Sequence, residues 1–369
     1  MIENAPSARG AARRAGVAGA AAERLFTDAP DPAPGGDVRR GGSSPMTPPP
    51  PLGRPRNKDG LTFDPALDDG ELAVVRDALA RGRWADARQL LARTGDDWDR
   101  RGHRLVVLAE GPTSAAWARD WQLAEPDSPD AAALLACATV FRALHGKDSP
   151  QAARALSLAA ARMAPRDPTP WLAMLVLARH TGTDDECVRA FDQVRARHRD
   201  HHHAHHLMAA CLAEHQEGDR DDPLHEVYDF ASWAAEQAPA DSPLAVLPVV
   251  AHAERYRVLA RAGLEPADPA RSGHWTTRRA RQVMKAAFDW WLEWDVDEEA
   301  AGVAGGAHPR RKVDLNYLAH AKLHEGRPAE AAALLTRIGP HATHAPWSYP
   351  DRDPRAAFRA ARRDALGVA

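Results

Sequence analysis

Apolar residues recur at the spacing of an α-helix through most of the chain after residue 60. Between residues 134 and 199 they form two consecutive helix–turn–helix patterns in the same phase. Valine and isoleucine seldom alternate with polar residues, so strands are not expected. The pattern therefore predicts an all-α fold, an irregular α-solenoid of antiparallel helix pairs. Further helices or helix pairs are expected at residues 71–94, 101–124, 203–215, 223–237, 244–262, 275–294, 314–338 and 354–366.

Two dipeptides mark the expected helix starts. Ser-Pro occurs at residues 128–129, 149–150 and 242–243, and Asp-Pro recurs, for example at 64–65 and 353–354. A serine or aspartate side chain can accept a hydrogen bond from the free backbone N–H groups, and proline in the first turn loses none. Their repeated use predicts many helices separated by short turns.

Residues 1–60 have a different composition from the rest of the chain. They hold ten of the thirty prolines, many glycine and alanine residues, and very few large apolar side chains. Such a segment cannot bury enough surface to offset its ordering entropy, so a disordered leader is expected. Met46 is an alternative start, which would make residues 1–45 a translated leader without function. The remainder is expected to divide into repeats at 64–218, irregular long helices at 219–311, and a terminal pair with a capping helix at 312–366.

Charge and cysteine content narrow the class of protein. The 369 residues carry a formal charge of −3, so no general attraction to nucleic acid or to a membrane surface is expected. No apolar run approaches the roughly 20 residues of a transmembrane helix. Cys137, Cys187 and Cys211 lie far apart inside apolar helical patterns, as expected for buried, reduced thiols in a cytoplasmic protein.

The two central helix–turn–helix patterns repeat with a period of 34 residues, starting at 134 and 168. Counted from residue 168, Trp171 takes position 4, Met174 position 7 and Cys187 position 20. A small residue at position 20 allows the two helices to pack closely, and the apolar positions fill the seam to the next pair. Ala153 and Ala331 occupy the same small position in other pairs.

This pattern resembles the tetratricopeptide-repeat (TPR) family, whose period is 34 residues. Two departures are clear: Phe141 and Leu175 stand at a position that is small in the family, and an insertion at 218–222 interrupts the period. The resemblance implies an array that binds other proteins. We therefore expect a protein-interaction scaffold, bacterial and regulatory or accessory in role, with a protein or peptide partner.

In TPR arrays the first helix of each pair lines a concave groove, and the resemblance assigns ten residues to it. They are rich in arginine and histidine, which suits an acidic or C-terminal peptide. The simpler interpretation is that they are solvated polar positions. The Lys and Asn pattern of the family's carboxylate clamp is not matched. The ten residues are Arg142, His145, Arg179, His180, His203, His206, Asn316, Tyr317, His320 and His324.

Histidine offers the alternative function. The chain has eighteen, concentrated in HRDHHHAHH at 198–206. His202 and His206 are four apart, as are Cys211 and His215, so each pair shares a helix face and could hold zinc. No third or fourth ligand is visible in the sequence, so no metal and no cofactor is expected. The alternative is a metal-binding protein or enzyme that uses the histidine-rich helices around 198–215.

A tryptophan-rich segment and the absence of enzyme motifs bear on the remaining function classes. Trp290, Trp291 and Trp294 form a broad aromatic face, which is expected to pack against residues 244–262 and the last pair or, alternatively, to form a homodimer. The phosphate loop GxxxxGK[ST] and the GxSxG elbow are absent, and the basic run at 309–312 is short. We therefore expect no enzyme, no catalytic residues and no nucleic-acid partner.

Overall fold

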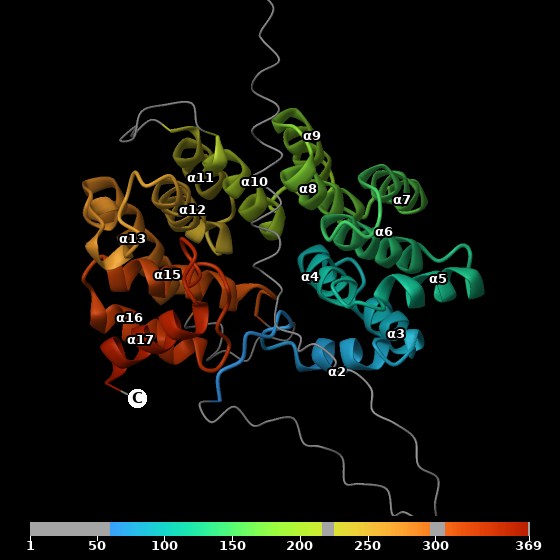
Figure 1. Ribbon diagram of the computed structural model, residues 1–369, viewed down its shortest axis with the longest axis horizontal. Helices are drawn as coiled ribbons and strands as arrows, with labels where there is room; N and C mark the ends of the chain where they lie inside the picture. The colour runs from blue at the N-terminus through green and yellow to red at the C-terminus, as the bar shows by residue number, and fades with distance from the viewer. Residues whose placement is uncertain (1–59, 216–224, 296–306, 368–369) are drawn as a thin grey trace, which may run out of the picture. The chain divides into compact units, whose positions relative to one another are not determined.

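The computed structural model describes residues 60–215, 225–295 and 307–367 (Figure 1). Met1–Gly60 and Leu61–Ala369 form separate units, and the three segments expected between 64 and 366 all belong to the second. The predictions for the leader and for Met46 concern residues outside the described ranges. So does the insertion at 218–222.

Helices in antiparallel pairs make up the second unit, which confirms the all-α solenoid for the described residues. Among the residues described, none forms a strand, and no helix is long and apolar enough to cross a membrane. The first four pairs are α2 (Gly70–Leu79) with α3 (Trp84–Thr94), α4 (Trp98–Ala109) with α5 (Ser114–Ala124), α6 (Pro129–Leu144) with α7 (Pro150–Met163), and α8 (Thr169–Thr181) with α9 (Asp184–Arg195). The later helices are α10 (His202–Glu214) with α11 (Glu226–Gln237), α12 (Leu247–Arg261) with α13 (Arg278–Trp290), α15 (Arg311–His324) with α16 (Pro328–Ile338), and the terminal α17 (Pro354–Leu366).

Caps explain several helix starts. The side chain of Ser128 accepts a hydrogen bond from the backbone N–H of Ala131, and Ser149 does the same for Ala152. Asp353 caps α17 in the same way. Each of these residues precedes a proline in the first helical turn, so the dipeptide rule holds at these three starts.

The 34-residue period holds for some helices and fails for one. α7 and α9 begin at Pro150 and Asp184, 34 residues apart. α6, however, begins at Pro129 rather than at 134. Its first turn is capped by Ser128 and contains the buried Ala131, Ala132 and Ala133, so the packed surface of this helix extends further than the repeat predicts.

The aromatic segment at 275–294 is not one continuous α-helix. Gly273–Thr276 is a 3₁₀ turn, and α13 starts after Thr277, whose side chain accepts a hydrogen bond from the N–H of Ala280. Residues Trp291–Asp295 follow as a π-helical turn. The segment Pro243–Val246 (η1) is a second 3₁₀ turn, which precedes α12.

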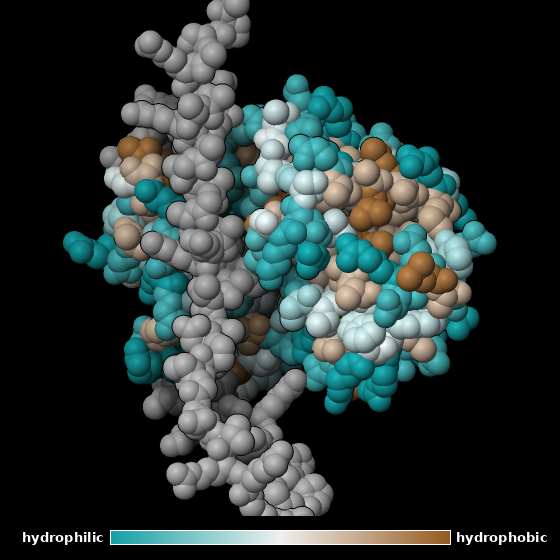
Figure 2. Space-filling model, turned by 45° about the vertical axis from the view of Figure 1, so that its right-hand side comes forward, coloured by the Kyte–Doolittle hydropathy of each residue, from teal (hydrophilic) through white to brown (hydrophobic). Residues whose placement is uncertain are grey.

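In the pairs after α2 and α3, the first helix is buried more completely than the second. On α8, eight residues are buried, whereas on α9 only Cys187, Ala190, Phe191 and Val194 are. The outer helices carry scattered exposed apolar side chains, such as Leu123 and Val188. Figure 2 shows brown apolar residues interspersed with teal polar ones. Single exposed apolar residues of this kind are normal on a soluble surface.

The beginning and the end of the second unit are joined. The N–H of Thr62 donates to the carbonyl of Pro340 (2.8 Å), and the N–H of Ala342 donates to the carbonyl of Thr62 (3.0 Å). Inner helices from distant parts of the chain also meet, because α10 contacts α4, α8 and α12, and α12 contacts α15. This packing brings histidines of α10 against an acidic residue of α15.

Candidate metal centre

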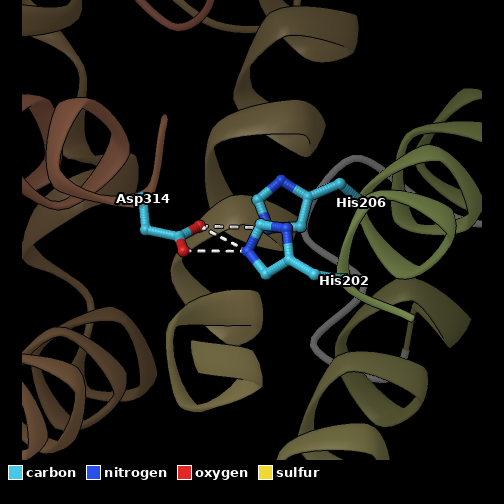
Figure 3. A group of neighbouring side chains, drawn as sticks. All are labelled: His202, His206 and Asp314. Carbon is cyan, nitrogen blue, oxygen red and sulfur yellow. Dashed lines mark hydrogen bonds and ion pairs between the residues drawn. The ribbon is translucent and has the colours of Figure 1, made fainter. Parts of the chain in front are cut away.

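His202, His206 and Asp314 converge in the interior of the helix array (Figure 3). The Nε2 atom of His202 lies 2.8 Å and 3.0 Å from the two carboxylate oxygens of Asp314. The Nε2 atom of His206 lies 3.2 Å from Oδ1 of the same carboxylate. All three residues are buried, with exposed fractions of 0%, 7% and 5%. Their possible ligand atoms all lie within 4.8 Å of one another.

Helix geometry accounts for the arrangement. His202 and His206 are one turn apart on α10, so their rings lie side by side, with centroids 4.1 Å apart. Asp314 lies in the first turn of α15, where the positive end of the helix dipole favours a carboxylate. In Figure 3 the two imidazoles and the carboxylate point toward one another from these two elements.

The protonation states suit metal ligation. Burial lowers the pKa of His202 to about 3, so this imidazole is neutral at pH 7. Burial alone would raise the pKa of Asp314, but His202 and His206 outweigh burial and hold that pKa well below its usual range. A neutral imidazole and an ionised carboxylate are the forms that bind a metal ion.

The distances between donor atoms fit a small tetrahedral ion. Zinc binds imidazole nitrogen and carboxylate oxygen at about 2.0–2.2 Å, so two ligand atoms of a tetrahedral site lie about 3.3 Å apart. The Nε2 atoms of His202 and His206 lie 3.0 Å and 3.2 Å from Oδ1 of Asp314, so these two separations need to widen by only a few tenths of an ångström. Two histidines and one carboxylate would leave a fourth position open.

A second acidic group holds the surrounding histidines. Asp99, on α4, accepts a hydrogen bond from the backbone N–H of His202 (2.9 Å) and lies 2.9 Å from Nε2 of His198. His201 and His308 lie 3.5 Å and 3.7 Å from the same carboxylate. Asp99 thereby fixes the start of α10, while the ring of His308 lies 4.6 Å from that of His202. Burial would raise the pKa of Asp99, but the hydrogen bond from His198 and the nearby His201 and His308 outweigh burial and hold that pKa well below its usual range.

A pocket of about 210 Å³ adjoins the candidate centre through Asp314. His308 and Arg311 line it together with the three tryptophans of the aromatic segment, Trp290, Trp291 and Trp294. Trp290 donates a hydrogen bond from Nε1 to the carbonyl of Ala240 (2.8 Å), and Trp291 is buried. The aromatic segment also contacts α12 and α15, as predicted from the sequence. Dimerisation through these tryptophans stays a prediction.

Four of the ten residues assigned to a peptide groove lie in the interior instead. His206 belongs to the candidate metal centre. Asn316 accepts a hydrogen bond from Nε1 of Trp347 (2.6 Å), and the hydroxyl of Tyr317 donates to Glu254 (2.8 Å). His320 is 1% exposed, and its ring lies 5.2 Å from that of Trp347. The expected open surface is absent at these four positions, because α15 packs against α12 and the segment 341–349.

The other six assigned residues are more accessible to solvent, and several of them pair with neighbouring residues of the chain. Arg142 forms an ion pair with Asp148 (2.6 Å), and Arg179 forms one with Glu214 (2.8 Å). His145 and His180 are exposed on the surface, and the ring of each hydrogen-bonds to the backbone carbonyl four residues earlier. The two remaining assigned residues, His203 and His324, are half-buried. A peptide-binding role for these residues stays a prediction.

The sequence did not reveal Asp314, Asp99 or His308 as members of the site. His202 and Asp314 are 112 residues apart, and nothing in the spacing of either helix links them. The available signal was a carboxylate inside an apolar helix, next to Val313 and Leu315. Such a residue needs a buried partner, but the sequence does not identify which one.

Comparison with known proteins finds no match: no protein-family model matches the chain, and no curated protein is significantly similar to it. Membership of the TPR family therefore stays a prediction.

Proposed function

We propose that this protein binds one divalent transition-metal ion, with zinc the best fit, through His202, His206 and Asp314. Imidazole and carboxylate together suit zinc better than magnesium or calcium, which prefer oxygen ligands alone. Three protein ligands with an open fourth position are typical of sites that exchange a water molecule or a substrate, whereas structural zinc sites are closed by four protein ligands.

The observation that carries this proposal is the second histidine. A hydrogen bond between His202 and Asp314 would be enough to fasten α10 to α15. Nε2 of His206 nevertheless lies 3.2 Å from the same carboxylate and makes no hydrogen bond with any residue that the structure describes. An unsatisfied buried polar atom costs about 1–3 kcal/mol. A bound metal ion would give this nitrogen a ligand bond in place of that cost.

One feature differs from many zinc sites. Ligating histidines usually donate their second ring N–H to a carboxylate or carbonyl. The Nδ1 atom of His202 has no hydrogen-bond partner in the described ranges. The ring is instead positioned by its neighbours, the rings of His206 and His308, at 4.1 Å and 4.6 Å.

Metal analysis of untagged, full-length protein tests the proposal. After dialysis against zinc and then against buffer, the wild type should retain one equivalent by inductively coupled plasma mass spectrometry. His206→Ala and Asp314→Asn should retain less than a tenth of that, with unchanged helical circular dichroism. His145→Ala, which alters an exposed histidine outside the centre, is the matched control and should behave as wild type.

Two results of this metal analysis would contradict the proposal. If folded His206→Ala and Asp314→Asn proteins retain as much zinc as the wild type, the ion is bound elsewhere and the proposal is wrong. If the wild type retains none, a protein-interaction scaffold without a metal becomes the better proposal.

A further inference from the structure

The pocket beside the candidate metal centre lies between the aromatic segment and one face of α15. Arg311, Asp314, Leu315 and Leu318 line it from α15, at the i, i+3, i+4 and i+7 spacing of a single helix face. Asp314 therefore belongs both to the pocket wall and to the proposed ligand set. A metal ion held by Asp314 would lie next to the pocket, and its open position could be reached from there.

The opposite wall determines the shape of a suitable ligand. Trp290 is held by its hydrogen bond to Ala240, and Trp291 is 4% exposed, so both rings are fixed. Trp294 is 38% exposed. Tryptophan faces favour a flat aromatic ring in stacked or edge-to-face contact. The volume of about 210 Å³ is below the roughly 300–1,000 Å³ typical for drug-sized ligands, so a single ring suits it better than a fused system.

Charge determines the polar part of the ligand. Asp241 and Asp314 contribute negative charge to the pocket wall, while Arg311 contributes positive charge. A divalent ion bound to Asp314 changes this balance, because it adds two positive charges beside that carboxylate. A metal-loaded pocket therefore favours an anion, and a carboxylate can occupy the open metal position.

We infer that the pocket binds a small single-ring aromatic carboxylate, whose ring packs against Trp290 and Trp294 and whose carboxylate takes the open position on the metal. This inference rests on the proposed function, because the carboxylate needs the ion. Binding of this ligand class does not require that the ligand be chemically altered.

Full-length protein loaded with cobalt(II) gives a direct test, since cobalt replaces zinc and its visible absorption reports the ligand sphere. Benzoate should change the cobalt spectrum and quench tryptophan fluorescence with the same dissociation constant. Acetate, which lacks the ring, and benzylamine, which has a cationic group, should each bind at least tenfold more weakly. Trp294→Ala should weaken benzoate about tenfold while leaving the spectrum without benzoate unchanged, because the variant removes an aromatic contact with the ligand but none of the metal ligands.

The outcomes separate this inference from the function on which it rests. If cobalt binds and benzoate leaves the spectrum unchanged up to tens of millimolar, the ligand assignment is wrong and the metal site stands. If benzylamine binds as tightly as benzoate, the anionic class is wrong. If no cobalt binds, both the inference and the proposed function are wrong.

Discussion

The pairs α2–α9 and the helices α10–α17 share one architecture but differ in what their inner helices bury. The inner face of α6 is built from alanine, leucine, valine and cysteine, with Thr139 as its one buried polar residue. The inner helices α10, α12 and α15 bury a mixed set of histidine, glutamate, arginine, aspartate, asparagine and lysine side chains. In the first region α6 thus forms an apolar seam, although α4 buries Arg101, His103 and Arg104, whereas all three of these inner helices in the second region have polar interiors.

One part of the polar interior in the second region is satisfied by internal hydrogen bonds and ion pairs. Glu254 accepts hydrogen bonds from Arg257, Tyr317 and Tyr349, and Arg257 also pairs with Glu214 (2.6 Å). Such a network fastens α12 to α15 and to the segment after α16. Several ring nitrogens of the histidines around Asp314 have no hydrogen-bond partner among the residues described, and the same holds for both ring nitrogens of His252 and His320. Internal hydrogen bonds therefore account for the glutamate network but not for these histidines, and those around Asp314 differ from the others because they converge on a carboxylate.

Acid should have the largest effect, and it should act on the second region first. Burial holds the pKa of His252 and His320 well below 6.5 and lowers that of His324 to about 4. Below pH 6.5 the unfolded chain therefore binds more protons than the folded one, so stability falls as the pH falls. Each such histidine contributes up to about 1.4 kcal/mol per pH unit, and several together should unfold the protein before pH 4.

Hydrogen exchange at pH 7 and pH 5, corrected for intrinsic rates, measures this effect. Protection in α15 should fall more than protection in α6. Equal losses of protection in α15 and α6 would contradict the expected difference in acid sensitivity between the two regions.

The next largest effect is expected at Glu254. Glu254→Ala leaves Arg257 buried without one of its carboxylate partners and should lower the free energy of unfolding by about 3–5 kcal/mol. Urea denaturation measures the change. Asp96→Ala is the matched control, because Asp96 and its partner Arg166 are both exposed and such ion pairs are worth less than about 1 kcal/mol. Equal effects for the two variants would argue against a stabilising network in the second region.

A cavity in the first region should lower the free energy of unfolding by about as much, but it should leave the metal centre intact. Leu134→Ala removes a fully buried side chain of α6 and should cost about 2–5 kcal/mol. The folded variant should still retain one equivalent of zinc after dialysis. Loss of zinc by this variant at a temperature where it remains folded would show that the two regions are coupled.

The smallest effect is the stabilisation that zinc itself provides. Free zinc at one hundred times its dissociation constant should stabilise the folded state by about 2.7 kcal/mol. Wild type and His145→Ala should show this gain in thermal unfolding, whereas His206→Ala should not. A gain of the same size in His206→Ala would place the stabilising ion at another site.

The sequence predicted the scaffold better than the chemistry. Apolar periodicity and the Ser-Pro caps located α6 and α7, since both signals are local. The 34-residue repeat, counted from residue 134, misses the first turn of α6, whereas the Ser-Pro pair at 128–129 marks the start of this helix. The pair His202 and His206 was visible on one helix face, whereas Asp314 joins it only through contacts among α10, α12 and α15. The periodicity of a helix does not show which distant helix packs against it.

Anomalous X-ray scattering from crystals of the zinc-loaded, full-length protein tests the central claim most directly. We predict a peak at the zinc edge about 2.0–2.2 Å from Nε2 of His202, Nε2 of His206 and a carboxylate oxygen of Asp314. His215 offers a useful contrast, because it lies near Asp184 and Glu226 on a more exposed surface. A peak there, or at other surface histidines, with none at Asp314 would contradict the account.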